Sequence, residues 1–88
     1  MTDVFQGLKA QLEELEWPSL YMFKFVCPND NQTVASVIKH FNEVSEVEYK
    51  KSKNGKYIGV TVKELMLSAD SVISIYKEIA TIKGVISL

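Results

Sequence analysis

Few side chains in this sequence have the chemistry of catalytic groups, and those few are not spaced to act together. His40 is the only histidine and Cys27 the only cysteine among 88 residues. Nucleophilic catalysis needs a nucleophile, a base within hydrogen-bonding reach and a third group that orients the base. His40 falls on a predicted helix and Cys27 at the end of a predicted strand, so we interpret them as a boundary residue and a small core residue. We therefore expect no catalytic residues and a protein that is not an enzyme.

The sequence also lacks the ligand spacing of a metal site and the glycine pattern of a phosphate-binding loop. One histidine and one cysteine cannot build a structural zinc site. Glu46 and Glu48 share one face of a predicted strand and could reach a hard cation. We favour a solvated strand face, which Lys50 and Lys63 could neutralise across strands. Neither the P-loop motif nor the G-x-G-x-x-G motif occurs, and we expect no metal and no cofactor.

Four lysines form the one basic concentration of the sequence: Lys50, Lys51, Lys53 and Lys56. One interpretation is an electrostatic docking patch for RNA or an acidic partner. The other, which we favour, is a soluble hairpin tip whose lysines discourage aggregation through the sheet edge. The net charge of −1, the absence of arginine and a single outward aromatic residue, Tyr57, argue against nucleic acid as a partner. Weak RNA binding through these lysines is kept as an alternative.

The dipeptide Asn54-Gly55 stands between two runs of alternating β-type residues, which is the strongest short-range signal for a β-hairpin. The dipeptide predicts a two-residue type I′ turn with positive φ at both positions. The flanking strands are expected at about residues 46–52 and 57–64. Val47 and Tyr49 are assigned to the inner face of the first of them.

The hydrophobic periodicity around this hairpin predicts the remaining elements. A first strand over residues 20–27 alternates, with Tyr21, Phe23, Phe25 and Cys27 facing the core and Met22, Lys24 and Val26 facing away. Apolar residues at helical spacing predict helices over residues 2–16, over residues 32–42 and from the cap Ser68 to just before Gly84. Residues 85–88 form a short last strand.

This order predicts an α+β protein with the ferredoxin-like arrangement β-α-β-β-α-β, a four-stranded antiparallel sheet with two helices on one face, plus an N-terminal helix. The chain is one domain, residues 1–88, in which residues 1–16 form the N-terminal helix and residues 19–88 the core. That helix is expected to cover the open sheet face or to pair with another copy of the chain.

The composition indicates the cellular compartment that we expect for this protein. A single cysteine excludes an intramolecular disulfide, which fits a reducing cytoplasm. No apolar run approaches the roughly 18 residues that a membrane span needs. We expect a cytoplasmic protein that does not enter a membrane.

Several segments resemble the YbeD-like family of uncharacterised small bacterial proteins. They are Trp17-Pro18-Ser19, Phe23-Lys24-Phe25-Val26, Ser52-Lys53-Asn54-Gly55-Lys56-Tyr57, Val60-Thr61-Val62, Ile75-Tyr76-Lys77-Glu78 and Val85-Ile86-Ser87-Leu88. The resemblance implies a likeness to ACT domains, regulatory modules that bind amino acids or similar ligands, often across a dimer. It also implies a weak link to lipoate attachment. The ACT ligand loop corresponds here to Cys27–Asn31, which lacks the usual glycine, and Asn29, Asp30 and Asn31 are the ligand-binding candidates that it implies.

Three functions are therefore open. The first is a non-catalytic regulator or adaptor that acts through protein contacts, with an unknown protein partner or a homodimer, on a surface of Met22, Lys24, Val26, Lys53, Lys56 and Tyr57. The second is ACT-like sensing of an amino acid or a lipoate-related molecule. The third is weak RNA binding.

Overall fold

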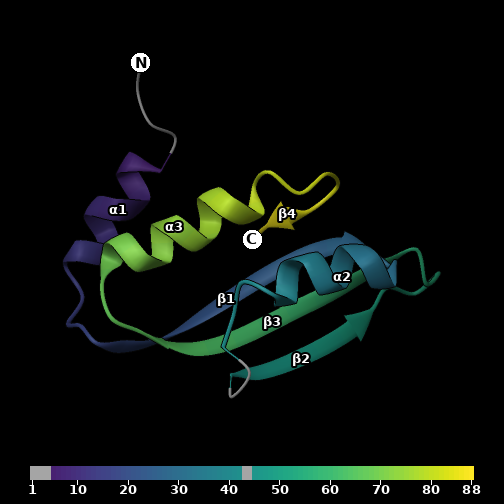
Figure 1. Ribbon diagram of the computed structural model, residues 1–88, viewed down its shortest axis with the longest axis horizontal. Coiled ribbons are helices and arrows are strands. Elements are labelled where there is room, and N and C mark those ends of the chain that lie inside the picture. Colours follow the sequence, from purple (N-terminus) through teal and green to yellow (C-terminus); the bar gives the residue numbers. More distant parts are fainter. Residues whose placement is uncertain (1–4, 43–44) are drawn as a thin grey trace.

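The computed structural model describes residues 5–42 and 45–88 of the chain. Its elements are α1 (Gln6–Glu13), β1 (Ser19–Pro28), α2 (Asn31–Ile38), β2 (Glu46–Lys51), β3 (Tyr57–Met66), α3 (Ala69–Ile79) and β4 (Ile86–Ser87) (Figure 1). The described part of the chain thus contains three helices and four strands, as the sequence predicts. The boundaries differ by a few residues, since the predicted helix over residues 32–42 ends at Ile38.

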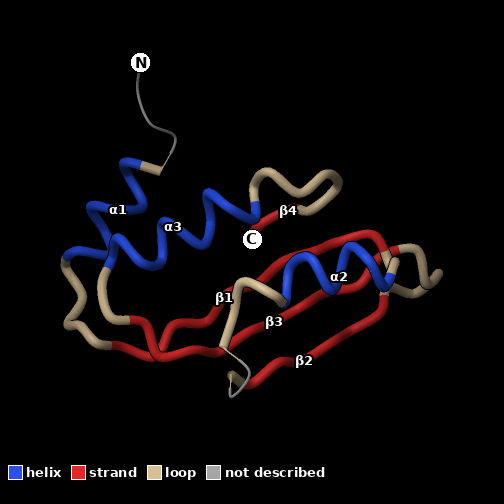
Figure 2. Tube along the Cα trace, in the orientation of Figure 1, coloured by secondary structure: helices blue, strands red, loops and turns tan. Residues whose placement is uncertain are grey.

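The four strands form one antiparallel sheet in the order β2-β3-β1-β4. The two long strands, β1 and β3, pair over their whole length, from Ser19 opposite Met66 to Pro28 opposite Tyr57. Strand β4 pairs with β1 only at Phe25 and Val26. Strand β2 is therefore one edge of the sheet and pairs with six of the ten residues of β3, and β4 is a very short edge on the other side (Figure 2).

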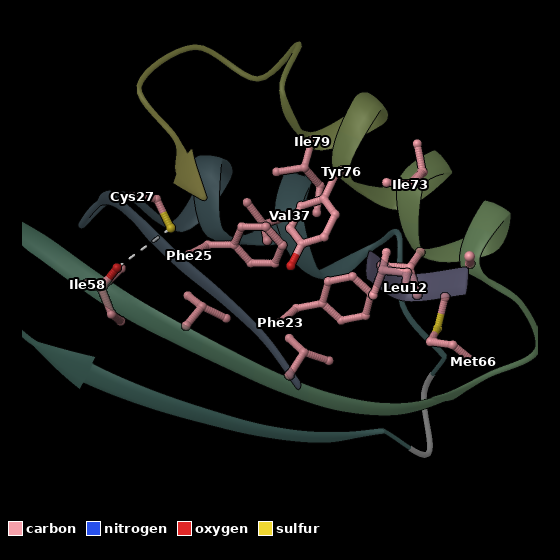
Figure 3. Close-up of a cluster of buried hydrophobic side chains, with 14 residues drawn as sticks. Leu12, Phe23, Phe25, Cys27, Val37, Ile58, Met66, Ile73, Tyr76 and Ile79 are labelled. Atoms are coloured by element: carbon pink, nitrogen blue, oxygen red, sulfur yellow. Dashed lines mark hydrogen bonds between the residues drawn. The ribbon is translucent and has the colours of Figure 1, made fainter. Parts of the chain in front are cut away.

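The core lies between one face of the sheet and the helices, and it follows the predicted alternation. Phe23, Phe25 and Cys27 of β1 are almost completely buried, and they meet the buried side of β3 and the apolar stripes of α2 and α3 (Figure 3). The buried residues are Leu12, Phe23, Phe25, Cys27, Val37, Ile58, Val60, Val62, Met66, Ala69, Val72, Ile73, Tyr76 and Ile79. Removing this apolar surface from water is the main force that holds the sheet and helices together.

Aromatic rings organise the middle of this core. The ring of Phe23 lies 5.3 Å from that of Tyr76 on α3 and 5.1 Å from that of Phe41, which follows α2. Tyr21 packs edge-on against Phe23 at 4.7 Å, and its hydroxyl lies 3.0 Å from the Tyr76 hydroxyl. Edge-to-face contacts at these centroid distances are favourable, so the rings join β1 to both helical segments.

Helix α3 begins as the sequence predicts. The Ser68 hydroxyl accepts a hydrogen bond from the Ser71 backbone N–H at 3.1 Å, and the Ser71 hydroxyl accepts one from the Ser68 N–H at 3.2 Å. This reciprocal cap satisfies two donors that a helix start leaves free. The negative charge of Asp70 in the first turn and the positive charge of Lys77 in the last turn both interact favourably with the helix dipole.

Helix α1 packs beside α3 rather than over the open face of the sheet (Figure 1). Leu12 enters the core, the Trp17 indole N–H donates to the Leu12 carbonyl at 2.9 Å, and Lys9 Nζ lies 3.0 Å from Asp70 Oδ1. The expectation that this helix covers the open sheet face is therefore wrong, because its apolar stripe completes the core beside α3. The predicted start of the helix, residues 2–4, lies outside the described residues.

The hairpin between β2 and β3 is present, but its turn differs from the prediction. Among the described residues only Gly55 and Gly84 have positive φ, so Asn54 does not adopt the type I′ conformation. The Gly55 N–H donates to the Ser52 carbonyl at 3.0 Å, and Gly55 itself takes φ 75°. The Asn54 side chain explains the difference, because its Oδ1 accepts the Lys56 N–H at 3.1 Å and the Ser52 hydroxyl at 3.0 Å. These bonds stabilise a longer loop, residues 52–56.

Candidate functional site

The face of the sheet opposite the helices, here called the outer face, carries four of the predicted interaction residues. Met22, Lys24 and Val26 alternate with the buried side chains of β1 and therefore point outward. Tyr57 lies on the same face of β3 and is half exposed. No helix in the described residues packs against this face. Side chains of all three helices instead join the inward side chains of the sheet in the hydrophobic core.

Exposed apolar side chains gather at one end of the outer face, where β1 begins and β3 ends. Leu20 and Leu65 stand directly opposite each other, and Met22 is the diagonal neighbour of Leu65. Leu20 is 67% exposed, Leu65 60% and Met22 45%. We call these three residues the outer apolar cluster. Leu20 and Leu65 were missed as site candidates because each lies near a strand end, where alternation alone does not show what covers them.

Charged and polar side chains occupy the middle of the outer face. Lys24 stands opposite Thr61, which stands opposite Glu48, and Lys63 stands between Met22 and Glu46. At the far end Val26 pairs with Ile86, which is 59% exposed. The outer face is therefore apolar at both ends and charged between them, a composition that can contact a protein surface at several points.

The hairpin lysines are exposed and held on an ordered loop. Besides the bonds within the loop, Asn29 Nδ2 donates to the Gly55 carbonyl at 2.9 Å, and the Asn29 N–H donates to the Lys56 carbonyl at 3.0 Å. In the described chain no carboxylate lies within ion-pair distance of Lys53 or Lys56. The loop thus presents uncompensated positive charge beside Tyr57.

The predicted ligand-binding residues Asn29, Asp30 and Asn31 have structural roles in this loop. Asn29 binds the hairpin through its backbone and its side chain, so the structure brings it beside Lys56. Asp30 is the residue before α2, and its Oδ2 accepts the Thr33 hydroxyl at 3.0 Å. Asn31 is the first residue of α2 and is exposed. Two of the three polar side chains are therefore already occupied by bonds within the chain.

Three further titratable side chains, Cys27, His40 and Tyr76, lie away from the outer face. Cys27 is fully buried, its Sγ lies 3.7 Å from the Ile58 carbonyl, and burial raises the pKa of its thiol. The His40 Nδ1 lies 2.9 Å from Glu78 Oε2 at the ends of α2 and α3. Desolvation, reinforced by the Tyr21 hydroxyl, raises the pKa of Tyr76. Within the described ranges no three histidine, cysteine or carboxylate side chains cluster as metal ligands would.

Glu64 makes two hydrogen bonds that the sequence did not indicate. Its Oε1 accepts the Asn42 N–H and the Ser45 hydroxyl, both at 2.6 Å. The carboxylate thereby fastens the connection between α2 and β2 to the end of β3, beside a shallow hollow that Leu20 and Leu65 also line. Because both partners belong to a segment distant in sequence, no local pattern could reveal this role.

None of the helices in the described residues is long and apolar enough to cross a lipid bilayer. In comparisons with known proteins, residues 12–88 match the model of a family described as a protein of unknown function, DUF493. Neither the curated proteins nor the solved structures gave a significant match to the chain.

Proposed function

Because the chain belongs to the DUF493 family of proteins of unknown function, we propose its role from its surface: a non-catalytic regulator or adaptor that binds a partner protein through the outer face. The observation that carries this proposal is the outer apolar cluster of Leu20, Met22 and Leu65, exposed side by side on a face without a covering helix. Exposed apolar clusters of this kind are typical of protein interaction sites.

The arrangement of charges supports a specific contact rather than nonspecific hydrophobic association. Lys24 and Lys63 of the outer face lie next to the outer apolar cluster, and the hairpin adds Lys53, Lys56 and Tyr57 at the opposite end. Charged residues at the border of an apolar contact are usual in a reversible protein interface, and here Lys24 and Lys63 border the outer apolar cluster. The partner expected from these charges carries acidic side chains around an apolar contact.

Affinity capture with matched variants tests this proposal. Leu65→Glu and Met22→Glu place a carboxylate in the outer apolar cluster without touching the core, because both side chains point away from it. Ser74→Glu, on the exposed side of α3, is the control for added negative charge. We expect partner proteins from the native lysate that the wild type and the control retain and that both outer-face variants lose. If no captured protein depends on the outer face, the proposal is wrong.

We further propose that the fold is the ferredoxin-like one and that this family corresponds to the YbeD-like, ACT-resembling bacterial proteins. The element order from β1 to β4 and the strand order β2-β3-β1-β4 support the first part. The hairpin residues from Ser52 to Tyr57 support the second. Backbone superposition of an experimental structure on representative ferredoxin-like and ACT domains tests both parts.

The hairpin lysines support weak RNA binding as a second candidate function, since the ordered loop leaves them without carboxylate partners. Electrostatic binding to phosphates is strongest at low salt. A shift of single-stranded RNA at low salt, lost in Lys53→Ala/Lys56→Ala, is the result expected from this candidate. Absence of any shift under these conditions excludes it.

A further inference from the structure

Gly59 leaves the outer face without a side chain near the middle of the sheet. It belongs to β3 and stands between Val26 of β1 and Lys50 of β2, which both point outward with it. Its backbone is that of an ordinary strand, since only Gly55 and Gly84 have positive φ among the described residues. A Cβ atom at this position would meet only the Lys50 carbonyl oxygen, at 3.5 Å, which is an ordinary contact. Neither the backbone conformation nor the packing of the chain therefore requires glycine here.

A glycine that the fold does not require destabilises a central strand, because it packs no side chain and loses much backbone entropy on folding. Such a glycine often marks a place where a ligand approaches the backbone closely. A hollow of about 380 Å³ lies over this position. That volume is within the range of sites for small molecules. Its lining includes Lys24, Val26, Glu48, Lys50, Gly59 and Leu88.

Two lysines and one carboxylate determine the charge of the hollow. Lys24 and Lys50 approach it from opposite sides, because they belong to the two strands that flank β3. Glu48 adds one negative charge, and the ion pairs of the described chain involve none of these three side chains. Two positive charges and one negative charge leave the hollow with a net charge of +1. This charge is complementary to a monoanion and disfavours a dianion.

Apolar groups lie directly beside Gly59. Val26 is its neighbour on β1, and Leu88 is held next to β1 by the hydrogen bond from its N–H to the Lys24 carbonyl at 2.9 Å. In β-sheets an aromatic ring that packs over a glycine compensates for the missing side chain. The two direct neighbours of Gly59 supply no such ring, since they are a valine and a lysine.

We propose that the hollow over Gly59 binds a small aromatic carboxylate. The ring covers Gly59 and contacts Val26, and the carboxylate lies between the ammonium groups of Lys24 and Lys50. The site is independent of the partner contact proposed above, because none of the three residues of the outer apolar cluster lines the hollow. It is also separate from the loop Asn29–Asn31, which does not line the hollow either.

Titration of the ¹⁵N-labelled protein with benzoate, followed by NMR at low salt and pH 8, tests the proposal. Benzamide is the uncharged control of the same shape, and inorganic phosphate is the dianion control. We expect the amide signals of Val26, Lys50 and Gly59 to shift with benzoate and to saturate with a Kd of about 1 mM or below. Benzamide and phosphate should each bind about tenfold more weakly or less.

Substitutions separate binding from folding. Gly59→Val fills the hollow and should weaken benzoate binding by about tenfold or more, while it raises the midpoint of urea unfolding because valine favours strands. Gly7→Ala in α1 is the matched control, which should stabilise the protein and leave binding unchanged. Lys50→Met should weaken binding about three- to fivefold. Lys39→Met, at the end of α2 on the other side of the sheet, should not change it.

Several results would overturn the proposal. One is a benzoate titration that does not approach saturation by about 10 mM. Others are equal binding of benzamide, or shifts that centre on Asn29–Asn31 or on the hairpin lysines. Gly59→Val that binds benzoate like the wild type, or that lowers the midpoint of urea unfolding, would show that the glycine serves the fold and not a ligand. If Gly59→Val does not fold, unchanged affinity in Lys50→Met overturns the proposal by itself.

Discussion

Tyr76 offers a sharp test of the core, because its hydroxyl lies among apolar groups at the junction of β1 and α3. The side chain is 6% exposed, its ring contacts those of Phe23, Phe25 and Phe5, and its hydroxyl lies 3.0 Å from that of Tyr21. Tyr76→Phe keeps the ring and removes the oxygen. Near pH 8 we expect a loss of about 1 kcal/mol in the free energy of unfolding, the usual net value of one hydrogen bond.

Raising the pH should reverse the sign of this difference. Burial raises the pKa of Tyr76 in the folded protein, whereas in the unfolded chain the phenol ionises near its ordinary value of about 10. The stability that belongs to the neutral phenol is complete below pH 10 and is lost as the pH rises towards the raised value. Each pH unit above 10 then costs the wild type about 1.4 kcal/mol that Tyr76→Phe does not lose. At pH 11 the variant should equal or exceed the wild type in stability.

Urea unfolding followed by circular dichroism at pH 8, 9, 10 and 11 measures this crossover. Every other ionisable group is present in both proteins, so the difference between wild type and variant isolates the Tyr76 phenol. Tyr49→Phe is the matched control, because it removes the same hydroxyl from a ring that is 53% exposed. A constant deficit of Tyr76→Phe from pH 8 to pH 11 would falsify the assignment of a buried, neutral hydroxyl.

Substitutions at four further positions test local structure, each by urea unfolding. Gly55→Ala should destabilise the protein by about 1 kcal/mol or more, because φ is 75° there, whereas Gly7→Ala, which meets no atom within 4 Å in α1, should stabilise it by about 0.5–1 kcal/mol. Ser68→Ala should cost about 1 kcal/mol through the lost cap, and rescue by Ser68→Asp distinguishes capping from packing. Asn29→Ala should lower the free energy of unfolding by about 0.5–1.5 kcal/mol, because it removes the hydrogen bond from the Asn29 side chain to the Gly55 carbonyl. Unchanged stability would contradict this structural role and leave Asn29 a ligand-binding candidate.

The open surfaces of the sheet divide the possible interactions of this protein into two kinds. The outer face offers side chains, with the outer apolar cluster at one end and lysines at the other. The β2 edge offers backbone groups, because β2 is an outer strand of the sheet and all its residues except Val47 are exposed.

The helices and strands were predictable because their patterns are local. The alternation from Tyr21 to Cys27 and the stripe of Val72, Tyr76 and Ile79 depend on strand and helix periods that each segment carries within itself. The prediction of the turn failed at Asn54 because the backbone preference of Asn-Gly competes with side-chain hydrogen bonds. Here those of Asn54 and Ser52 determine the loop.

By itself the sequence determined the number and order of the elements, the inward and outward side chains of β1, and the lysines of the hairpin, since all of these follow from spacing along a few residues. Only the tertiary structure decided where α1 packs, that Asn29 holds the hairpin, that Glu64 fastens a distant segment, and that Tyr49 is left half exposed. Each of these depends on which distant elements become neighbours. Sheet order and helix placement decide that, because they are set by the burial of the whole apolar surface rather than by any local pattern.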